Sequence, residues 1–169
     1  MEVLPATMDH LESYKDFLLA CLDSGIKKYE MPLQDPKSYL EKIVSHTIED
    51  FLPEDWPKTS TFFCIENDEI LGTIRVRHGT TPYIERVVGH VGYETKPTAR
   101  GKGVAKLMLS WLQQNIISQT VIITCESNNI ASRKVIESCS GKYINEIYSH
   151  EKNAEVMRYQ LPGFKKESK

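Results

Sequence analysis

The sequence lacks the cysteine patterns of metal sites and of disulfide-stapled folds. Its four cysteines, Cys21, Cys64, Cys125 and Cys139, are scattered, with no C-x-x-C pair and no histidine at zinc-ligand spacing. Three of them, all but Cys139, lie in apolar periodic segments, where a free thiol behaves as a small buried hydrophobe. These absences predict that there is no metal site and that the thiols are reduced and structural, as in cytoplasmic proteins.

Long apolar runs and a strong charge of one sign are also missing. No segment approaches the roughly 18 apolar residues of a membrane span. The N-terminal stretch 1–17 begins with an acidic residue and lacks a basic region, which predicts no signal peptide. The formal net charge of -2 argues against a general nucleic-acid or membrane-surface binder. We expect a cytoplasmic protein whose partners are small molecules or local peptide segments.

The remaining composition is that of one globular domain. The chain has 169 residues, of which 40% are hydrophobic and 26% charged. This length is sufficient for one hydrophobic core but short for two domains of ordinary size. It contains no internal repeat, low-complexity tract or linker. We predict a single domain over residues 1–162, followed by a polar, mobile tail over 163–169.

Periodicity predicts a mixture of strands and helices. Apolar residues spaced by three and four indicate helices, whereas alternation or short all-apolar runs indicate strands. In the first half of the chain we expect a strand over 1–5, a helix over 8–22 capped by Thr7, a loop over 24–35, and a helix that starts at Asp35-Pro36, includes Ile48 and ends by Pro53 and Pro57. A hairpin over 59–66 and 70–77, a loop over 80–88 and a strand over 90–95 should follow. In the remainder we expect a helix after Gly103, a strand over 121–125, a helix after Asn129, and a strand pair over 142–149 and 155–161. This order is that of a mixed α+β protein.

The most informative stretch is residues 89–109, GHVGYETKPTARGKGVAKLML. It predicts a strand, a tight glycine turn and the start of a helix. The first turn of a helix carries unpartnered N–H groups and the positive end of the helix dipole, so it attracts anions. Gly101 and Gly103 would let a phosphate approach these donors, with Arg100 and Lys102 nearby. The P-loop and the three-glycine dinucleotide fingerprint are both absent, so we interpret the turn as a diphosphate cradle of another kind. The alternative is a helix start whose glycines serve only packing.

The hexapeptide Arg100-x-x-Gly103-x-Ala105, placed after a strand that ends at Lys96-Pro97, resembles the acetyl-CoA pyrophosphate signature of the GNAT superfamily of N-acetyltransferases. The resemblance implies a mixed, mostly antiparallel sheet of about six or seven strands with about four helices. It also implies acetyl-CoA as co-substrate, without a metal. The residues that it assigns to acetyl-CoA in this stretch are Tyr93, Thr95, Arg100, Gly101, Lys102, Gly103, Val104 and Ala105.

A second motif lies downstream, where Asn129-Ile130-Ala131-Ser132 is followed by Val135, Ile136, Glu137 and Gly141. It is similar to the Asn-x-x-Ser helix of GNAT members related to ribosomal-protein-alanine acetyltransferases, and more so to a group of predicted acetyltransferases. The resemblance implies that Asn129 and Ser132 contact the pantetheine and phosphate portions of CoA. The residues equally permit an Asn N-cap bonded to Ser132. Ile136 stands where many members carry a thiolate-protonating Tyr, and Ser140-Gly141 where Gly-Gly is common.

N-acetyl transfer requires a donor to the thioester carbonyl and a group that removes the amine proton. The resemblance assigns the first task to the backbone of Tyr93 to Thr95. His90 and Glu94 are the catalytic candidates for the second, because alternation places both on one face of the strand and histidine titrates in a useful range. The alternatives are that His90 is a packed or surface histidine and that a water chain serves as the base.

The amine acceptor is predicted only by class. The resemblance places it near residues 24–35 and 79–88, where Glu30, Asp35 and Glu85 could attract a cationic amine or be merely solvated. The sequence thus predicts an N-acetyltransferase acting on a small-molecule or peptide amine. Two alternatives stay open: a non-catalytic acyl-CoA sensor or scaffold of the same fold, and a nucleotide-phosphate binder of another fold. Many relatives dimerise, so a homodimer through the last hairpin is also open.

Overall fold

The computed structural model describes residues 1–47 and 55–166. These form a mixed α+β protein with seven strands in the sheet order β1-β2-β3-β4-β5-β7-β6, as predicted from the resemblance. The chain divides into two compact units. Unit 1 contains Met1–His78 and Tyr93–Val104, and unit 2 contains Gly79–Gly92 and Ala105–Lys169. Within the described ranges, no helix has the length and apolar character needed to cross a membrane.

Unit 1 is built on an antiparallel meander of β1 (Glu2–Pro5), β2 (Thr59–Glu66) and β3 (Glu69–Arg77). The predicted hairpin is confirmed, with β3 starting one residue earlier than expected. Its turn consists of Asn67 and Asp68, both with positive φ (51° and 63°). Two left-handed residues make the kind of turn whose twist matches the flanking strands, and Asn and Asp tolerate that conformation.

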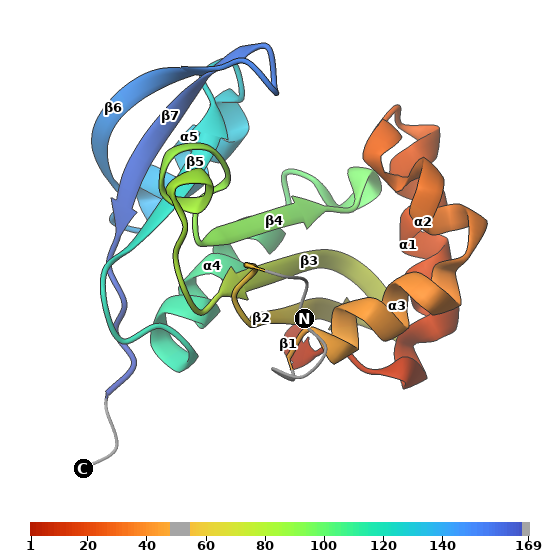
Figure 1. Ribbon diagram of the computed structural model, residues 1–169. Helices are drawn as coiled ribbons and strands as arrows, with labels where there is room; N and C mark the ends of the chain where they lie inside the picture. The colour runs from red at the N-terminus through yellow and green to blue at the C-terminus, as the bar shows by residue number, and fades with distance from the viewer. Residues whose placement is uncertain (48–54, 167–169) are drawn as a thin grey trace. The chain divides into compact units, whose positions relative to one another are not determined.

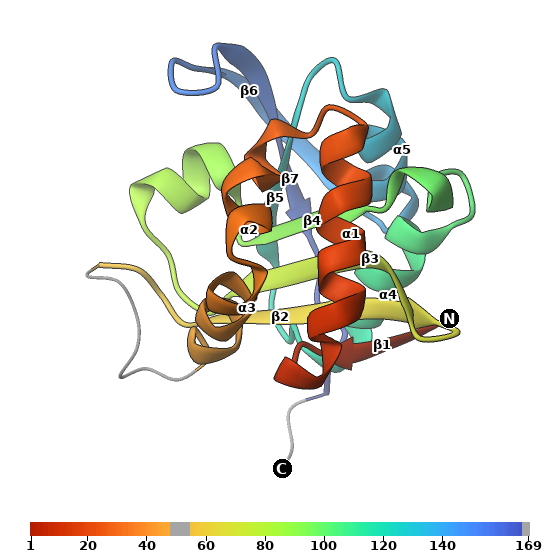
Figure 2. The ribbon, with the colours of Figure 1, turned by 90° about the vertical axis from the view of Figure 1, so that its right-hand side faces the viewer.

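Helices cover one face of this meander, with one packed on β3 and another on β2 (Figures 1 and 2). The first predicted helix begins as a 3-10 turn, η1 (Met8–His10), and continues as α1 (Leu11–Asp23). The next is α3 (Pro36–Ser45), whose first turn is capped by Asp35, which accepts the Ser38 N–H at 3.2 Å. The helix ends at Ser45, and His46 and Thr47 form a turn, so it is shorter than the predicted helix that included Ile48. Residues 48–53 lie outside the described residues.

The segment 24–35, expected as a loop, contains helical structure instead. It forms η2 (Lys27–Tyr29) and the short helix α2 (Glu30–Gln34). A helix of five residues is too short to show periodicity, and Pro32 argued against it in the sequence. Pro32 and Tyr29 are nevertheless buried, so tertiary packing rather than local propensity forms this segment.

The core of unit 1 lies between the helices and the meander. Its fully buried members include Phe17, Leu18, Leu40 and Phe63. The rings of Tyr14 and Phe63 stack with centroids 5.8 Å apart. This core fixes α1, η2 and α3 on β2 and β3, and thereby positions the side chains that face the meander.

Strand β4 (Val91–Thr95) runs from unit 2 into unit 1. It is followed in unit 1 by the 3-10 turn η5 (Pro97–Ala99) and the glycine turn, after which α4 (Val104–Asn115) begins. The predicted order of strand, glycine turn and helix is therefore confirmed. The strand starts at Val91 rather than at His90, which lies in the bend just before it.

Unit 2 contains β5 (Val121–Glu126), α5 (Ile130–Ser138), β6 (Lys142–Ser149) and β7 (Ala154–Leu161). Strand β5 is parallel to β4 at one register pair, Val91 with Ile123, and antiparallel to β7, which pairs with β6 (Figure 1). The predicted strands and helix are thus confirmed, with small shifts at their ends.

The predicted loop 80–88 is wrong in part, because Ile84–Val88 forms a helical turn, η4, of the π type. The Thr81 hydroxyl accepts the Ile84 N–H at 3.1 Å, and the Glu85 N–H bonds to the Thr81 carbonyl at 3.0 Å. Such a side-chain cap can start a helical turn without any periodic apolar pattern. Pro82 and the irregular pattern hid it in the sequence.

The C-terminal segment is attached to α4 by hydrogen bonds. The buried Gln113 side chain donates to the carbonyls of Cys139 and Pro162, both at 2.9 Å. The Phe164 N–H then bonds to the Gln113 carbonyl and the Lys165 N–H to the Ile117 carbonyl. The start of the predicted tail is therefore tied to the helix, whereas its end, 167–169, lies outside the described residues.

Candidate functional site

The glycine turn before α4 has the geometry of an anion cradle. Gly101 and Gly103 have φ of 75° and 80°, and no atom lies within 4 Å of a Cβ built on either of them. Both glycines and Lys102 between them are exposed. The backbone N–H groups of these three residues have no hydrogen-bond partner in the part of the chain that the structure describes. Open donors at the start of a helix are what a phosphate group binds.

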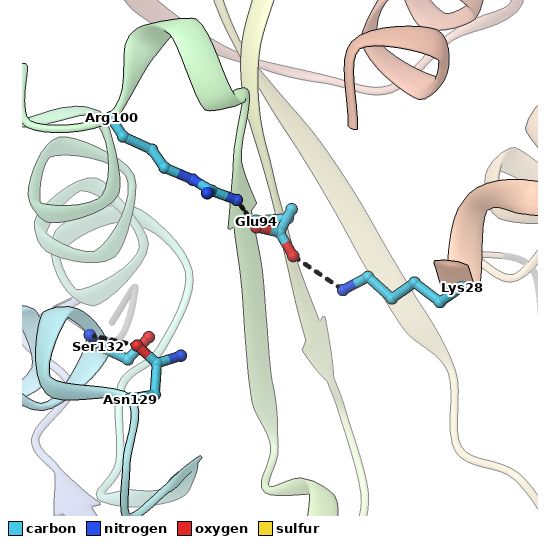
Figure 3. Close-up of polar contacts among 5 residues, drawn as sticks. All are labelled: Lys28, Glu94, Arg100, Asn129 and Ser132. Carbon is cyan, nitrogen blue, oxygen red and sulfur yellow. Dashed lines mark hydrogen bonds and ion pairs between the residues drawn. The ribbon is translucent and has the colours of Figure 1, made fainter. Parts of the chain in front are cut away.

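Charged side chains surround this turn in unit 1. Arg100 and Lys102 are exposed, and the Arg100 Nη2 atom lies 3.6 Å from Glu94 Oε1. The other carboxylate oxygen, Glu94 Oε2, lies 3.0 Å from Lys28 Nζ. Figure 3 shows Arg100 and Lys28 reaching Glu94 from opposite sides. Glu94 thus joins the glycine turn to η2, a link that the sequence analysis missed because Lys28 lay in an expected loop.

The other residues assigned to acetyl-CoA in this stretch offer mainly backbone. Thr95 is 9% exposed and Val104 is 1% exposed, so their side chains point into the protein. Val104 and Ala105 are the first two residues of α4, whose N–H groups have no carbonyl of a preceding helical turn to bond. Tyr93 is half-buried on β4. This arrangement fits the expected use of main-chain groups by a ligand.

Asn129 and Ser132 lie at the start of α5 in unit 2. Asn129 Oδ1 accepts the Ser132 N–H at 3.1 Å, as an N-cap (Figure 3). The capping alternative is therefore observed. Asn129 is exposed, and its amide NH₂ has no partner within the described ranges, so capping leaves a donor available to a ligand.

His90 is half-buried in unit 2. Its ring nitrogen Nδ1 accepts the Ile122 N–H at 3.0 Å, and the backbone N–H of His90 donates to the Ile122 carbonyl at 2.7 Å. Because Nδ1 is the acceptor, the proton of a neutral ring is on Nε2. The histidine is thus fastened to β5 through both its backbone and its ring.

Two of the three acidic residues that were candidates for attracting an amine have structural partners. Asp35 caps α3, and the Ser38 backbone N–H lowers the pKa of its carboxyl. Glu85 accepts the Thr80 hydroxyl at 3.1 Å. Glu30 is exposed on α2.

Within the described part of the chain, the cysteines and the other potential metal ligands form no cluster. All four thiols are free and buried, and no group of three or more His, Cys, Asp or Glu side chains within the described ranges could hold a metal ion. Burial raises the pKa of Cys21 and of Cys125 to about 11. These thiols are therefore protonated at neutral pH and behave as core residues.

The fold is shared with solved acetyltransferases. RimL, a ribosomal L7/L12 alpha-N-protein acetyltransferase in complex with coenzyme A, matches with a TM-score of 0.71 and 13% identity, covering 97% of this chain and 94% of that one. The microcin C7 self-immunity acetyltransferase MccE, in complex with acetyl-CoA and AMP, matches at 0.70 and 14%, covering 95% and 92%. A ribosomal-protein-S5-alanine acetyltransferase from Vibrio fischeri matches at 0.66 and 14%, covering 95% and 92%.

The sequence itself matches a family, although no curated protein matches it. Residues 29–141 match the family described as the acetyltransferase (GNAT) family. This region includes the glycine turn, β4 and the start of α5, so the match covers the residues that carry the site. Because the match spans more than half of the sequence, the chain belongs to the acetyltransferase (GNAT) family.

Proposed function

We propose that this acetyltransferase moves the acetyl group of acetyl-CoA to a primary amine by direct attack in a ternary complex. The observation that carries the proposal is the glycine turn, where two left-handed glycines leave three N–H groups without a partner among the described residues, beside two cationic side chains. Family membership supports acetyl transfer. Structural neighbours solved with coenzyme A or acetyl-CoA support the same ligand here.

The residues of the turn bind the nucleotide end of the co-substrate. The N–H groups of Gly101, Lys102 and Gly103 donate to the pyrophosphate, and Arg100 and Lys102 offset its charge. The backbone of Tyr93 to Thr95 donates to the thioester carbonyl oxygen, which gains negative charge during attack. Asn129 and Ser132 bind farther along the CoA chain. These assignments follow the predicted roles. The N–H groups of the turn, the exposed Arg100 and Lys102 and the exposed Asn129 support their own assignments. The roles of Tyr93 to Thr95 and of Ser132 stay predictions.

Acetyl-CoA supplies an activated acyl group. The amine nitrogen forms a bond to the acetyl carbonyl carbon, the carbon–sulfur bond breaks, and the thiolate leaves and takes up a proton. The products are an N-acetylated amine and free CoA thiol. Ile136 cannot supply that proton, because its side chain is aliphatic and fully buried. The assignment of amine deprotonation to His90 or Glu94 stays a prediction.

The acceptor is a small-molecule amine or a peptide amine. Neighbours include proteins whose names give ribosomal proteins as targets and one solved with AMP.

We propose that the enzyme is cytoplasmic and forms a homodimer through the β6–β7 hairpin. One observation supports the homodimer. Tyr143 and Tyr148 on β6 are 55% and 47% exposed, and exposed aromatic residues are common at protein interfaces.

A matched pair of glycine variants tests the cradle. Gly103 and Gly25 have similar left-handed conformations, with φ of 80° and 86°, and open space at the Cβ position. Alanine at either site brings the same local strain, about 1–2 kcal/mol, but only Gly103 belongs to the cradle. We expect Gly103→Ala to weaken acetyl-CoA binding at least about tenfold in titration calorimetry, and Gly25→Ala to leave it unchanged. Equal affinities for the two variants would refute the cradle.

Release of free thiol from acetyl-CoA, measured with a panel of primary amines, then tests transfer. Amine-dependent release that is lost in Gly103→Ala supports the proposed reaction. Acetyl-CoA binding without release on any amine would instead favour a sensor or scaffold, the alternative that the absence of Tyr at position 136 keeps open. Absence of acetyl-CoA binding in the unmodified protein would contradict both functions.

A further inference from the structure

A cavity of about 340 Å³ lies within unit 1, between the helices and the meander. It is lined by residues of α1, η2, α2, α3, β2 and β3 and has the size typical of small-molecule sites. Four aromatic side chains form much of its wall: Tyr14, Phe17, Tyr29 and Tyr39. Three of them are buried and the fourth is half-buried. The cavity can therefore accommodate an apolar or aromatic group.

Among the described residues, the charged side chains that line this cavity are of one sign. They are Lys28, Lys42, His46 and Arg75, and no described Asp or Glu is in the lining. Burial, together with the nearby Lys42 ammonium, lowers the pKa of His46 below its ordinary value, so its ring is mainly neutral at pH 7. The charge of Lys28 is offset by Glu94, its ion-pair partner at 3.0 Å. Lys42 and Arg75 therefore supply the positive charge that would attract an anion into the cavity.

Arg75 is the least satisfied of these cations. It is half-buried on β3, and in the part of the chain that the structure describes its guanidinium makes no ion pair or hydrogen bond. A half-buried guanidinium that has no acidic partner among the described residues can bind an anion. A carboxylate or a phosphate matches the donor geometry of a guanidinium in two parallel hydrogen bonds.

Tyr29 provides a second unsatisfied donor at the same place. The residue is 8% exposed, and its buried hydroxyl has no hydrogen-bond partner among the described residues. Burial raises the pKa of both Tyr29 and Tyr14, the latter to about 12, while the charge of Arg75 partly opposes the shift in each. Both phenols are therefore protonated donors near Arg75. Within the described ranges the Tyr29 hydroxyl and the Arg75 guanidinium both lack a protein partner, so both are available to an acceptor in the cavity.

The cavity is connected to the glycine turn inside unit 1. Lys28 lines the cavity and bonds to Glu94 at 3.0 Å, and Glu94 also pairs with Arg100 of the turn at 3.6 Å (Figure 3). A ligand in the cavity would thus lie next to the ion-pair chain that leads to the co-substrate site. This placement fits the second substrate of the transfer.

We infer that the cavity binds the anionic part of the acceptor, so that the substrate is a primary amine with a carboxylate or phosphate on an apolar or aromatic body. The inference rests on the proposed function. It reverses the expectation that acidic loop residues select the acceptor by attracting its amine. Here Arg75, Lys42 and the Tyr29 hydroxyl select the acceptor by its opposite, negatively charged end.

Direct binding of simple probes tests the cavity without any turnover. Phenyl phosphate and phenylacetate carry the two anions on a ring, and benzyl alcohol is the neutral counterpart. We expect both anions to bind the full chain at least about tenfold tighter than benzyl alcohol in titration calorimetry, and the tighter of the two identifies the preferred anion. Arg75→Gln and Lys42→Gln should each reduce this preference. Lys37→Gln, an exposed change on the same helix as Lys42, should not.

The possible outcomes distinguish failure of the inferred anion site from failure of the proposed acetyltransferase function. Lack of preference for anions, or equal loss in Lys37→Gln, overturns the inference even if acetyl-CoA binds and amines release thiol. Arg75-dependent anion binding in a protein that does not bind acetyl-CoA refutes the proposed function, and with it the assignment of the cavity to an acceptor.

If the protein transfers acetyl groups, two amines that differ only in their anionic group test the cavity during turnover. 4-(Aminomethyl)benzoate and benzylamine differ only by the carboxylate. Faster thiol release with the benzoate, lost in Arg75→Gln and inhibited competitively by the tighter anionic probe, supports the inference. Equal rates for the two amines would contradict it.

Discussion

His90 can remove a proton only if a lone pair of its ring is available. In a neutral imidazole one nitrogen carries the proton and the other accepts. Here the accepting nitrogen, Nδ1, already receives the Ile122 N–H at 3.0 Å. The sequence suggested a base because histidine titrates near neutrality, but it could not reveal this bond to a backbone group 32 residues away. The contact supports a positioning role for His90.

Two substitutions at His90 distinguish these roles. An asparagine carboxamide oxygen can accept the Ile122 N–H much as Nδ1 does, but it cannot take a proton near neutral pH. We expect His90→Asn to retain kcat within about threefold and to keep the pH profile of kcat, whereas His90→Ala leaves a backbone donor unpaired and costs about 1–3 kcal/mol of stability. Steady-state kinetics over a range of pH and urea unfolding measure the two effects. Loss of both turnover and the acidic limb in His90→Asn would instead assign proton transfer to His90.

At the scale of single elements, the end of α5 shows how local bonds terminate a helix. The Gly141 N–H bonds to the Ile136 carbonyl and the Ser140 N–H to the Glu137 carbonyl, the pattern of a Schellman cap. This cap requires a left-handed residue at position 140, and Ser140 has φ of 66°. The left-handed conformation costs serine conformational free energy, whereas glycine adopts it without steric strain.

Ser140→Gly should therefore stabilise the protein. The relief of left-handed strain exceeds the extra entropy of glycine in the unfolded chain, and we expect a gain of roughly 0.5–1 kcal/mol. The melting temperature should rise by about 1–4 °C in thermal unfolding followed by circular dichroism.

The neighbouring glycine provides a control of opposite sign. A Cβ at Gly141 would lie 2.7 Å from the Ile136 carbonyl oxygen, so Gly141→Ala should destabilise the same cap. A lower melting temperature in Ser140→Gly would show that the serine side chain contributes more than the strain costs.

In both units, buried thiols and phenols make the free energy of unfolding fall at alkaline pH. Burial raises the pKa of Cys21 in unit 1 and of Cys125 in unit 2 from 9.0 to about 11, and that of Tyr14 to about 12. A raised pKa means that the folded state holds its protons longer than the unfolded state does. The stabilisation is complete below pH 9 and is lost as the pH rises through 11.

Urea unfolding between pH 8 and pH 11 measures this loss. Each fully shifted thiol contributes a slope of about 1.4 kcal/mol per pH unit between its unfolded-state pKa of 9.0 and its folded-state pKa of about 11. Cys125→Ala should make the slope shallower, whereas Ser127→Ala, which removes a nearby group that does not titrate, should leave it unchanged. A free energy of unfolding that stays constant to pH 11 would show that these thiols are accessible to water in the folded state.

The sequence by itself determined the features that depend on neighbouring residues. Gly101 and Gly103 adopt left-handed backbone, Asn129 and Asp35 cap helices, and the turn at Asn67 closes a hairpin. Each of these follows from local backbone preferences, which act wherever the chain folds. The resemblance to acetyltransferases rested on motifs in these segments, and the family match over residues 29–141 confirmed the family.

Only the tertiary structure decided which distant side chains meet. Lys28 and Glu94 are 66 residues apart and form one ion pair, and Arg75 on β3 faces the phenols of Tyr14 and Tyr29 from other elements. Such contacts depend on how helices pack on strands, which local propensity does not encode. For that reason the sequence located the glycine turn that we propose to bind the co-substrate, whereas the cavity lined by Arg75 and Lys42 became visible only in the folded chain.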